Sequence, residues 1–185
     1  MAIRKLTDLP TLVPRGKRLL GLDTGSKTIG MAISDPGFSV ASPIGTIKRT
    51  KFTADARELA RYIKDREVGA VVIGLPVNMD GSEGPAAERA RQFAASMIEH
   101  KDLLGGELDI AFWDERLSTS AVQRMMIDAD MTRKRRAEVV DKMAAAYILQ
   151  GALDALSRFK AANAPPEDVH WADRRDDGNP EDGPV

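Results

Sequence analysis

The sequence contains no cysteine and no long apolar run, and it holds two histidines. The lack of cysteine excludes disulfides, thiolate nucleophiles, iron–sulfur clusters and cysteine-ligated zinc. No apolar run approaches the ~20 residues of a membrane span, and no apolar signal region adjoins the basic N-terminus. Neither histidine has neighbours that suit a catalytic base. We therefore expect a soluble, cytoplasmic protein without a membrane partner.

What is present predicts one folded domain. The chain has 185 residues, of which 43% are hydrophobic and 30% charged, so a wholly disordered chain is excluded. Residues 161–185 hold seven acidic and two basic side chains, which leaves 25 basic and 21 acidic side chains in the other 160 residues. We predict a flexible extension at 1–17, a mildly basic domain at 18–160 and an acidic disordered tail at 161–185. Such a basic domain is compatible with nucleic acid.

The apolar pattern predicts an α/β fold. Short apolar runs predict strands at 18–23, 29–34, 41–48, 70–73 and 108–113. Helical spacing predicts helices at 52–63, 85–98 and 134–159, and another that begins at Ser118 or Thr119. Three strands in a meander followed by alternating helices and strands imply a five-stranded mixed sheet flanked by helices on both faces.

Three carboxylates occupy unusual places in this pattern. Asp23 ends the first strand, and Glu115 follows the last one on the same side as Trp113. Asp141 heads an otherwise apolar helical stripe. The stripe consists of Ala144, Ala145, Ile148, Ala152 and Ala155. We interpret the three carboxylates as candidate catalytic residues.

Carboxylates that converge repel one another unless cations compensate them. An all-oxygen ligand set suits Mg²⁺ or Mn²⁺, and two such ions can support phosphodiester cleavage. The alternatives are structural: a turn residue for Asp23, a helix-start carboxylate for Glu115 and a salt-bridged helix residue for Asp141. Spacing alone does not decide between them.

Two further segments are candidate phosphate sites. Residues 21–28 come close to a phosphate-binding loop, but Ser26 replaces its second glycine and a strand follows instead of a helix. Residues 74–82, which include Asn78, join a buried strand to a helix that begins at Pro85. Backbone amides there could receive a phosphate, and tight-turn chemistry explains the segment equally well.

Four motifs together resemble one known family. They are GLDTGSKTIGMAISD at 21–35, GLPVNMDG at 74–81, DERLST at 114–119 and DKMAAAYILQ at 141–150. In this order and over residues 18–158 they resemble the YqgF-type pre-16S rRNA nucleases, which have also been classed as Holliday junction resolvases. The family usually has Lys-Arg in the first turn, whereas Lys27 is followed here by Thr28.

The resemblance implies a ribonuclease H-like fold and a nuclease that processes the 5′ end of pre-16S rRNA. Its expected partner is structured RNA, which could be presented on the small ribosomal subunit. The family's acidic positions fall on Asp23, Glu115 and Asp141, which would hold the metal ions. Lys27, Arg116, Asn78 and Ser118 are the candidate substrate contacts, although Ser118 could simply cap a helix. We expect a monomer or a weak homodimer.

Three alternatives remain open from the sequence. One is a Holliday junction resolvase acting on branched DNA. The second is a non-catalytic RNA-binding assembly factor that retains the carboxylates. The third is an actin-like ATP phosphotransferase, because its phosphate hairpin also has an Asp-x-Gly turn; that class normally needs two such domains.

Overall fold

The computed structural model describes residues 1–117 and 133–164. Its strands form a mixed sheet in the order β1-β6-β5-β2-β3-β4. The strands are β1 (Ile3–Arg4), β2 (Arg18–Thr24), β3 (Thr28–Ser34), β4 (Ala41–Lys48), β5 (Val68–Leu75) and β6 (Asp109–Asp114). Strands β2, β3 and β4 form an antiparallel meander, and β5 lies parallel to both β2 and β6. The predicted mixed α/β architecture is confirmed.

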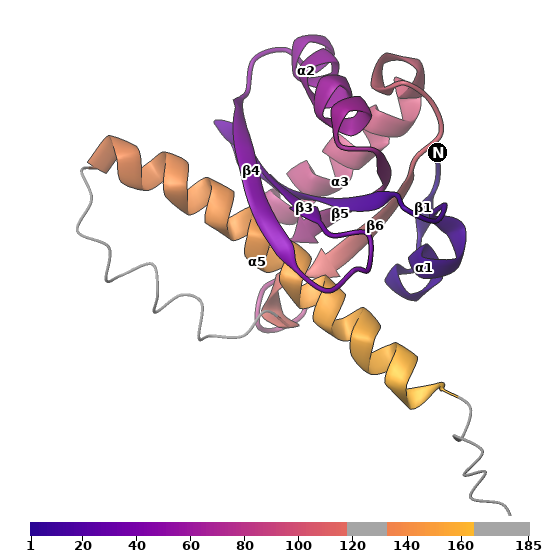
Figure 1. The fold of residues 1–185 in the computed structure, drawn as a ribbon. Helices are drawn as coiled ribbons and strands as arrows, with labels where there is room; N and C mark the ends of the chain where they lie inside the picture. Colours follow the sequence, from indigo (N-terminus) through magenta and orange to yellow (C-terminus); the bar gives the residue numbers. More distant parts are fainter. Residues whose placement is uncertain (118–132, 165–185) are drawn as a thin grey trace, which may run out of the picture.

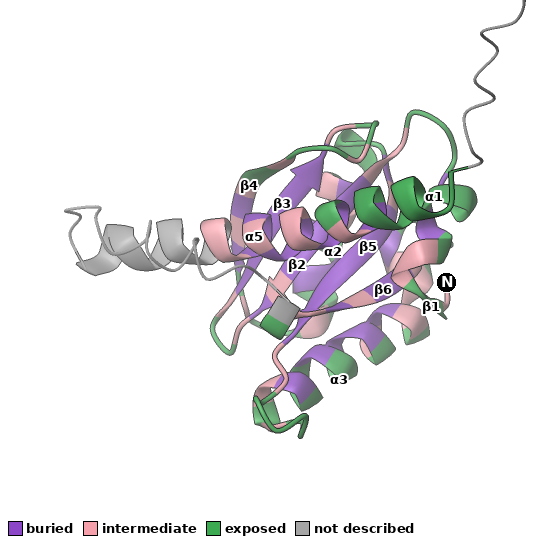
Figure 2. Ribbon diagram, turned by 90° about the horizontal axis from the view of Figure 1, so that it is seen from below, coloured by how far each residue is buried: buried purple, intermediate pink, exposed green. Residues whose placement is uncertain are grey.

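Helices cover both faces of the sheet (Figure 1). They are α1 (Leu9–Leu12), α2 (Phe52–Asp65), α3 (Pro85–Glu99) and α5 (Arg133–Ala162). Helices α2 and α3 pack on one face, and the C-terminal half of α5 packs with α1 on the other. Figure 2 shows the buried residues along the strands and on the helix sides that face them. Of the helices described, none is both long and apolar enough to cross a membrane.

The central strand β5 is buried because helices cover both faces of the sheet. In β5 every residue except Gly69 is buried, which agrees with its continuous apolar sequence. Helix α2 turns its apolar side to the sheet, and its buried Asp55 accepts hydrogen bonds from the backbone N and Oγ1 of Thr50. A buried carboxylate needs such partners. Because Thr50 lies in the connection between β4 and α2, its bonds to Asp55 hold this connection against the helix.

The N-terminal segment corrects two predictions. Residues 1–17, predicted as a flexible extension, contain β1, which pairs in parallel with β6 and makes the sheet six-stranded instead of five-stranded. Leu9 is fully buried and Val13 nearly so, in the same core as α5. Their spacing of four residues is one helical turn, which is too short to stand out in a sequence containing two nearby prolines.

Helix α5 lies directly against the centre of the sheet. A Cβ at Gly21 would stand 2.7 Å from the Cβ of Leu149 and 3.2 Å from the carbonyl oxygen of Ala145. Glycine is therefore required on β2 for this close approach. The helix predicted at 134–159 is confirmed; it is α5, which extends from Arg133 to Ala162. The predicted helix start at Ser118 or Thr119 and most of the predicted tail lie outside the described residues.

Candidate active site

Two of the three candidate carboxylates stand at one edge of the sheet. Asp23 is the penultimate residue of β2, and Glu115 opens a 3₁₀ turn (Glu115–Leu117) immediately after β6. Strands β2 and β6 run in the same direction on either side of β5. Their carboxyl ends therefore lie at the same edge. The sequence predicted each residue at the end of a strand but not that the two ends are neighbours.

Gly74 on β5 makes room between the two carboxylates. Leu22 pairs with Ile73, so the next residues of these parallel strands, Asp23 and Gly74, lie side by side. A Cβ at Gly74 would stand 2.6 Å from Oε1 of Glu115 and 2.5 Å from Cδ1 of Ile148 on α5. The Glu115 carboxylate thus occupies the space that a side chain at position 74 would fill. It lies on the α5 face, the face on which Trp113 is also buried.

The position of Glu115 changes its acidity. Burial, then the negative charge of Asp23 and then that of Asp114 raise the pKa of Glu115 from 4.5 to about 7. All three disfavour the charged form of Glu115, because burial removes water from the carboxylate and the two aspartates repel its negative charge. Glu115 is therefore close to half-protonated at neutral pH when no cation is bound.

Asp114, next to this group, has a cationic partner. Its carboxylate accepts hydrogen bonds from Arg116, at 2.6 Å from Nη2 and 3.0 Å from the backbone N. The Arg116 guanidinium holds the pKa of Asp114 below its usual range. Arg116 Nη1 also donates to the carbonyl oxygen of Asn78, at 3.4 Å. The predicted phosphate contact Arg116 thus links the end of β6 to the loop that follows β5.

That loop is held by bonds among its own residues. The side-chain amide of Asn78 donates to Oγ of Ser82, and that hydroxyl donates to Oδ1 of Asp80. Backbone bonds between Asn78 and Ser82 and the bridge between Val77 and Glu83 close the turn. The side chain of Asn78 therefore shapes this loop, and its contact with substrate remains a prediction.

The other candidates are placed to different extents. Lys27 is exposed in the turn between β2 and β3, four residues after Asp23. Asp141 belongs to α5, two helical turns before Ile148 and so on the same helical face, while its side chain is outside the described residues. Ser118 is also outside them. No group of three metal-binding side chains is found within the described part of the chain.

Two residues at this edge were missed in the sequence. Gly74 was interpreted only as part of a connecting loop, yet it permits Glu115 to approach Asp23. Asp114 is not among the candidate residues from the sequence, yet its charge raises the pKa of Glu115. For Gly74 the available signal was a glycine near the end of a buried apolar strand, where a β-branched residue is more usual.

A family model described as "RuvX: Holliday junction resolvase" matches residues 17–155. The chain belongs to this family. A protein named "Putative pre-16S rRNA nuclease" from Rhodospirillum centenum is 66% identical over 162 residues, covering 88% of this chain and 86% of that protein. A protein of the same name from Phenylobacterium zucineum is 55% identical over 157 residues, which cover 84% of this chain and 98% of that protein.

Among solved structures, the yeast mitochondrial Holliday junction resolvase Ydc2 superposes with a TM-score of 0.50 at 11% identity, over 84% of this chain and 85% of that one. This likeness confirms the predicted ribonuclease H-like fold. The family consists of nucleases and resolvases, so the predicted enzyme class, a hydrolase of phosphodiester bonds, is confirmed as well. Nucleases with this fold generally use divalent metal ions.

Proposed function

We propose that this chain is a metal-dependent endonuclease that processes the 5′ end of pre-16S rRNA, with Asp23, Glu115 and Asp141 as its catalytic carboxylates. The observation that supports this most is the approach of Glu115 to Asp23 over Gly74. Relatives named for pre-16S rRNA at up to 66% identity support the choice of RNA.

The residues at this edge fit a divalent cation. Two carboxylates without a histidine or cysteine offer the oxygen ligands that Mg²⁺ and Mn²⁺ prefer. The raised pKa of Glu115 reflects negative charge that a cation would neutralise. Asp141 of α5 would complete the ligand set, around two ions as in two-metal nucleases. When bound, the ions supply charge that activates water and stabilises the leaving oxygen.

The chain's own side chains have distinct roles in this proposal. Glu115 must lose its proton to become a ligand, which its pKa of about 7 permits near neutral pH. Lys27, exposed in the turn four residues after Asp23, would contact a phosphate of the substrate. Arg116 holds Asp114 and the loop at Asn78, so its contribution is to position this edge and to offset its negative charge. Ser118 remains a candidate substrate contact.

The test is a cleavage assay with purified protein, Mg²⁺ or Mn²⁺, and a 5′-extended pre-16S rRNA fragment. Asp23→Asn, Glu115→Gln and Asp141→Asn should each lower the rate at least about 100-fold. Asp65→Asn, which changes an exposed carboxylate at the end of α2, is the matched control and should cleave like the wild type. Full activity in all three active-site variants would refute the assignment.

Branched DNA is the second candidate substrate, because the matching family model is described as a resolvase and the fold is shared with Ydc2. A four-way DNA junction in the same assay separates the two. Cleavage of the junction without cleavage of RNA would favour a resolvase. RNA binding that EDTA does not change, with no cleavage of either substrate, would favour a non-catalytic assembly factor, and we expect a cytoplasmic monomer or weak homodimer in either case.

A further inference from the structure

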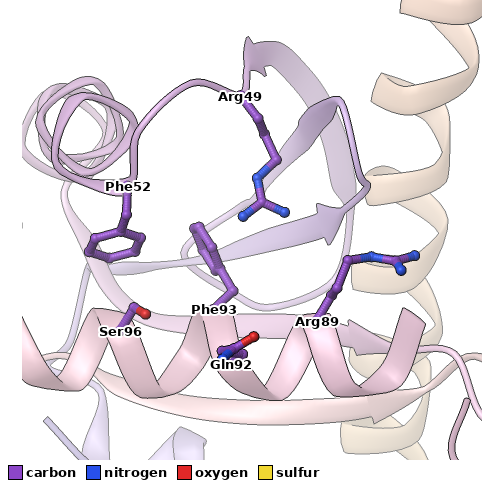
Figure 3. Close-up of a pocket in the computed structure, with 6 residues that line it drawn as sticks. All are labelled: Arg49, Phe52, Arg89, Gln92, Phe93 and Ser96. Atoms are coloured by element: carbon purple, nitrogen blue, oxygen red, sulfur yellow. The ribbon is translucent and has the colours of Figure 1, made fainter. Parts of the chain in front are cut away.

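A second concave site lies on the face of the sheet covered by α2 and α3. Its volume is about 400 Å³, which is within the range of ligand-binding pockets. The residues around it come from α3, from the start of α2 and from the segment between β4 and α2 (Figure 3). They are Arg49, Phe52, Arg89, Gln92, Phe93 and Ser96.

Arg49 connects this pocket to the β2–β3 hairpin turn, across the sheet from the α5 face on which Glu115 lies. The backbone N of Arg49 donates to the carbonyl oxygen of Lys27, at 2.9 Å. Its Nη1 donates to the carbonyl oxygen of Gly25, at 3.0 Å. Both acceptors lie in the turn that follows Asp23, so one guanidinium contacts the hairpin of the active site and also lines the pocket.

The lining combines cations with aromatic rings. The guanidinium of Arg49 lies over the ring of Phe93, 5.6 Å from its centroid, and Phe93 is only 3% exposed. Arg89 is exposed and forms no ion pair with the residues that the structure describes, whereas Arg91 on the same helix is paired with Glu83. No carboxylate is among the residues that line the pocket. The pocket therefore favours an anion.

Phe52 offers an aromatic surface at the other end of the pocket from Arg89 (Figure 3). Its ring contacts Phe93 edge-on at 5.6 Å and His100 at 5.3 Å, which fixes its orientation, and it is only partly buried. A partly exposed ring held in place can stack on a nucleobase of any sequence. Gln92 and Ser96 add polar groups along α3 that can hydrogen-bond a base or a sugar.

We propose that this pocket binds a single-stranded RNA segment that continues from the cleavage site around the β2–β3 hairpin turn, with one phosphate between Arg49 and Arg89 and one base against Phe52. The inference rests on the proposed nuclease function, since it places the pocket on the path of the substrate. Single-stranded nucleic acid is generally bound in this way, by cations that follow the backbone and aromatic rings that stack on the bases.

The experiment measures RNA binding without cleavage. A short fluorescein-labelled single-stranded RNA is titrated with the full chain in EDTA at several salt concentrations, and anisotropy gives Kd. Arg89→Ala should raise Kd about five-fold at low salt and reduce the slope of log K against log salt by about 0.7, the value for one phosphate contact of a single strand. Phe52→Leu should raise Kd to a similar extent but leave that slope unchanged.

Arg61→Ala is the matched control. Arg61 is another exposed arginine on a helix surface, nine positions after Phe52 on α2 and thus about 13 Å farther along the helix. Its removal should leave Kd and the salt slope within error of the wild type. Because Arg89 and Arg61 are both exposed, neither change should affect folding, and thermal melting of each variant checks this.

The outcomes separate this proposal from the nuclease assignment. If Arg89→Ala and Arg61→Ala have the same Kd and salt slope, the pocket is not an RNA subsite, even where the wild type cleaves pre-16S rRNA normally. If the wild type cleaves no RNA while Arg89→Ala alone weakens RNA binding and lowers the slope, the subsite is supported and the nuclease proposal fails. An unchanged affinity in Phe52→Leu would overturn the stacking role.

Discussion

Replacing Glu115 by glutamine is expected to raise the free energy of unfolding of the metal-free protein at pH 8. The change removes a charge that burial and the neighbouring Asp23 and Asp114 disfavour, while it keeps the size of the side chain. Proteins often carry such unfavourable groups at functional sites, where activity requires them. The variant should thus be more stable and, by the proposal above, inactive.

The expected gain follows from the pKa. Folding raises the pKa of Glu115 from 4.5 to about 7. At 1.36 kcal/mol per pKa unit, the ionised carboxylate therefore lowers the free energy of unfolding by at most about 3.4 kcal/mol. The side chain is partly exposed, and solvent screens its charge, so we expect about 1–2 kcal/mol. For a chain of this length that corresponds to an increase in Tm of about 2–8 °C.

The sign of the pH dependence is fixed by the direction of this pKa change. Below pH 4.5 Glu115 is protonated in both the folded and the unfolded state, so the wild type is as stable as Glu115→Gln. As pH rises from 4.5 to about 7 the unfolded chain releases its proton first, so the wild type loses stability relative to the variant. The difference should be absent near pH 4 and complete at pH 8.

Urea denaturation in EDTA at pH 4 and at pH 8 measures this difference. Glu58→Gln, a change at an exposed glutamate on α2, is the matched control and should shift the free energy by less than about 0.5 kcal/mol. At ten times its Kd, Mg²⁺ or Mn²⁺ should stabilise the wild type at pH 8 by about 1.4 kcal/mol, and Glu115→Gln by less. A variant no more stable than the wild type at pH 8 would refute the reasoning about the buried charge.

Three further changes test the surroundings of the site. Gly74→Ala places a Cβ against the Glu115 carboxylate, so we expect a loss of about 1–3 kcal/mol in urea denaturation together with slower cleavage; unchanged stability would contradict the close approach. Leu9→Ala should cost about 2–4 kcal/mol, because this side chain is fully buried, whereas a loose N-terminal extension would lose nothing. Arg116→Gln removes the partner of Asp114, so added negative charge should raise the pKa of Glu115 and move the acid limb of the cleavage–pH profile up by as much as about one pH unit; a profile that stays in place or moves down would be inconsistent with this.

The central strands and long helices could be predicted because their apolar patterns are long. The strands predicted at 18–23 and 29–34 agree within one residue with β2 and β3, and the helix from Pro85 ends within one residue of the prediction. Such patterns record burial, which the sheet and its two helical layers impose over many residues. The pairing of β1 with β6 could not be predicted, because two residues carry no period and their partner is more than 100 positions away.

The sequence predicted which residues form the candidate site better than it predicted how they are arranged in space. Asp23 and Glu115 interrupt apolar patterns at strand ends, and those interruptions are visible in the sequence. Their separation depends on the strand order β6-β5-β2 and on the missing side chain at Gly74, and neither follows from local spacing. The pocket at Arg49 and Arg89 was missed for the same reason, since its residues come from segments that only the fold brings together.

If the proposed metal binding holds, protons and cations compete for the Glu115 carboxylate beside Gly74. Packing of α5 and the central strands forces the Glu115 carboxylate toward Asp23, and the unfavourable charge can be relieved in two ways, by a proton on Glu115 or by a bound cation. Protonation leaves no ligand at that position. Because the pKa of Glu115 is about 7, the exchange of one for the other occurs near neutral pH. In the proposed function, the carboxylate that destabilises the metal-free fold would also be a ligand of the cation, which would explain why the protein retains it.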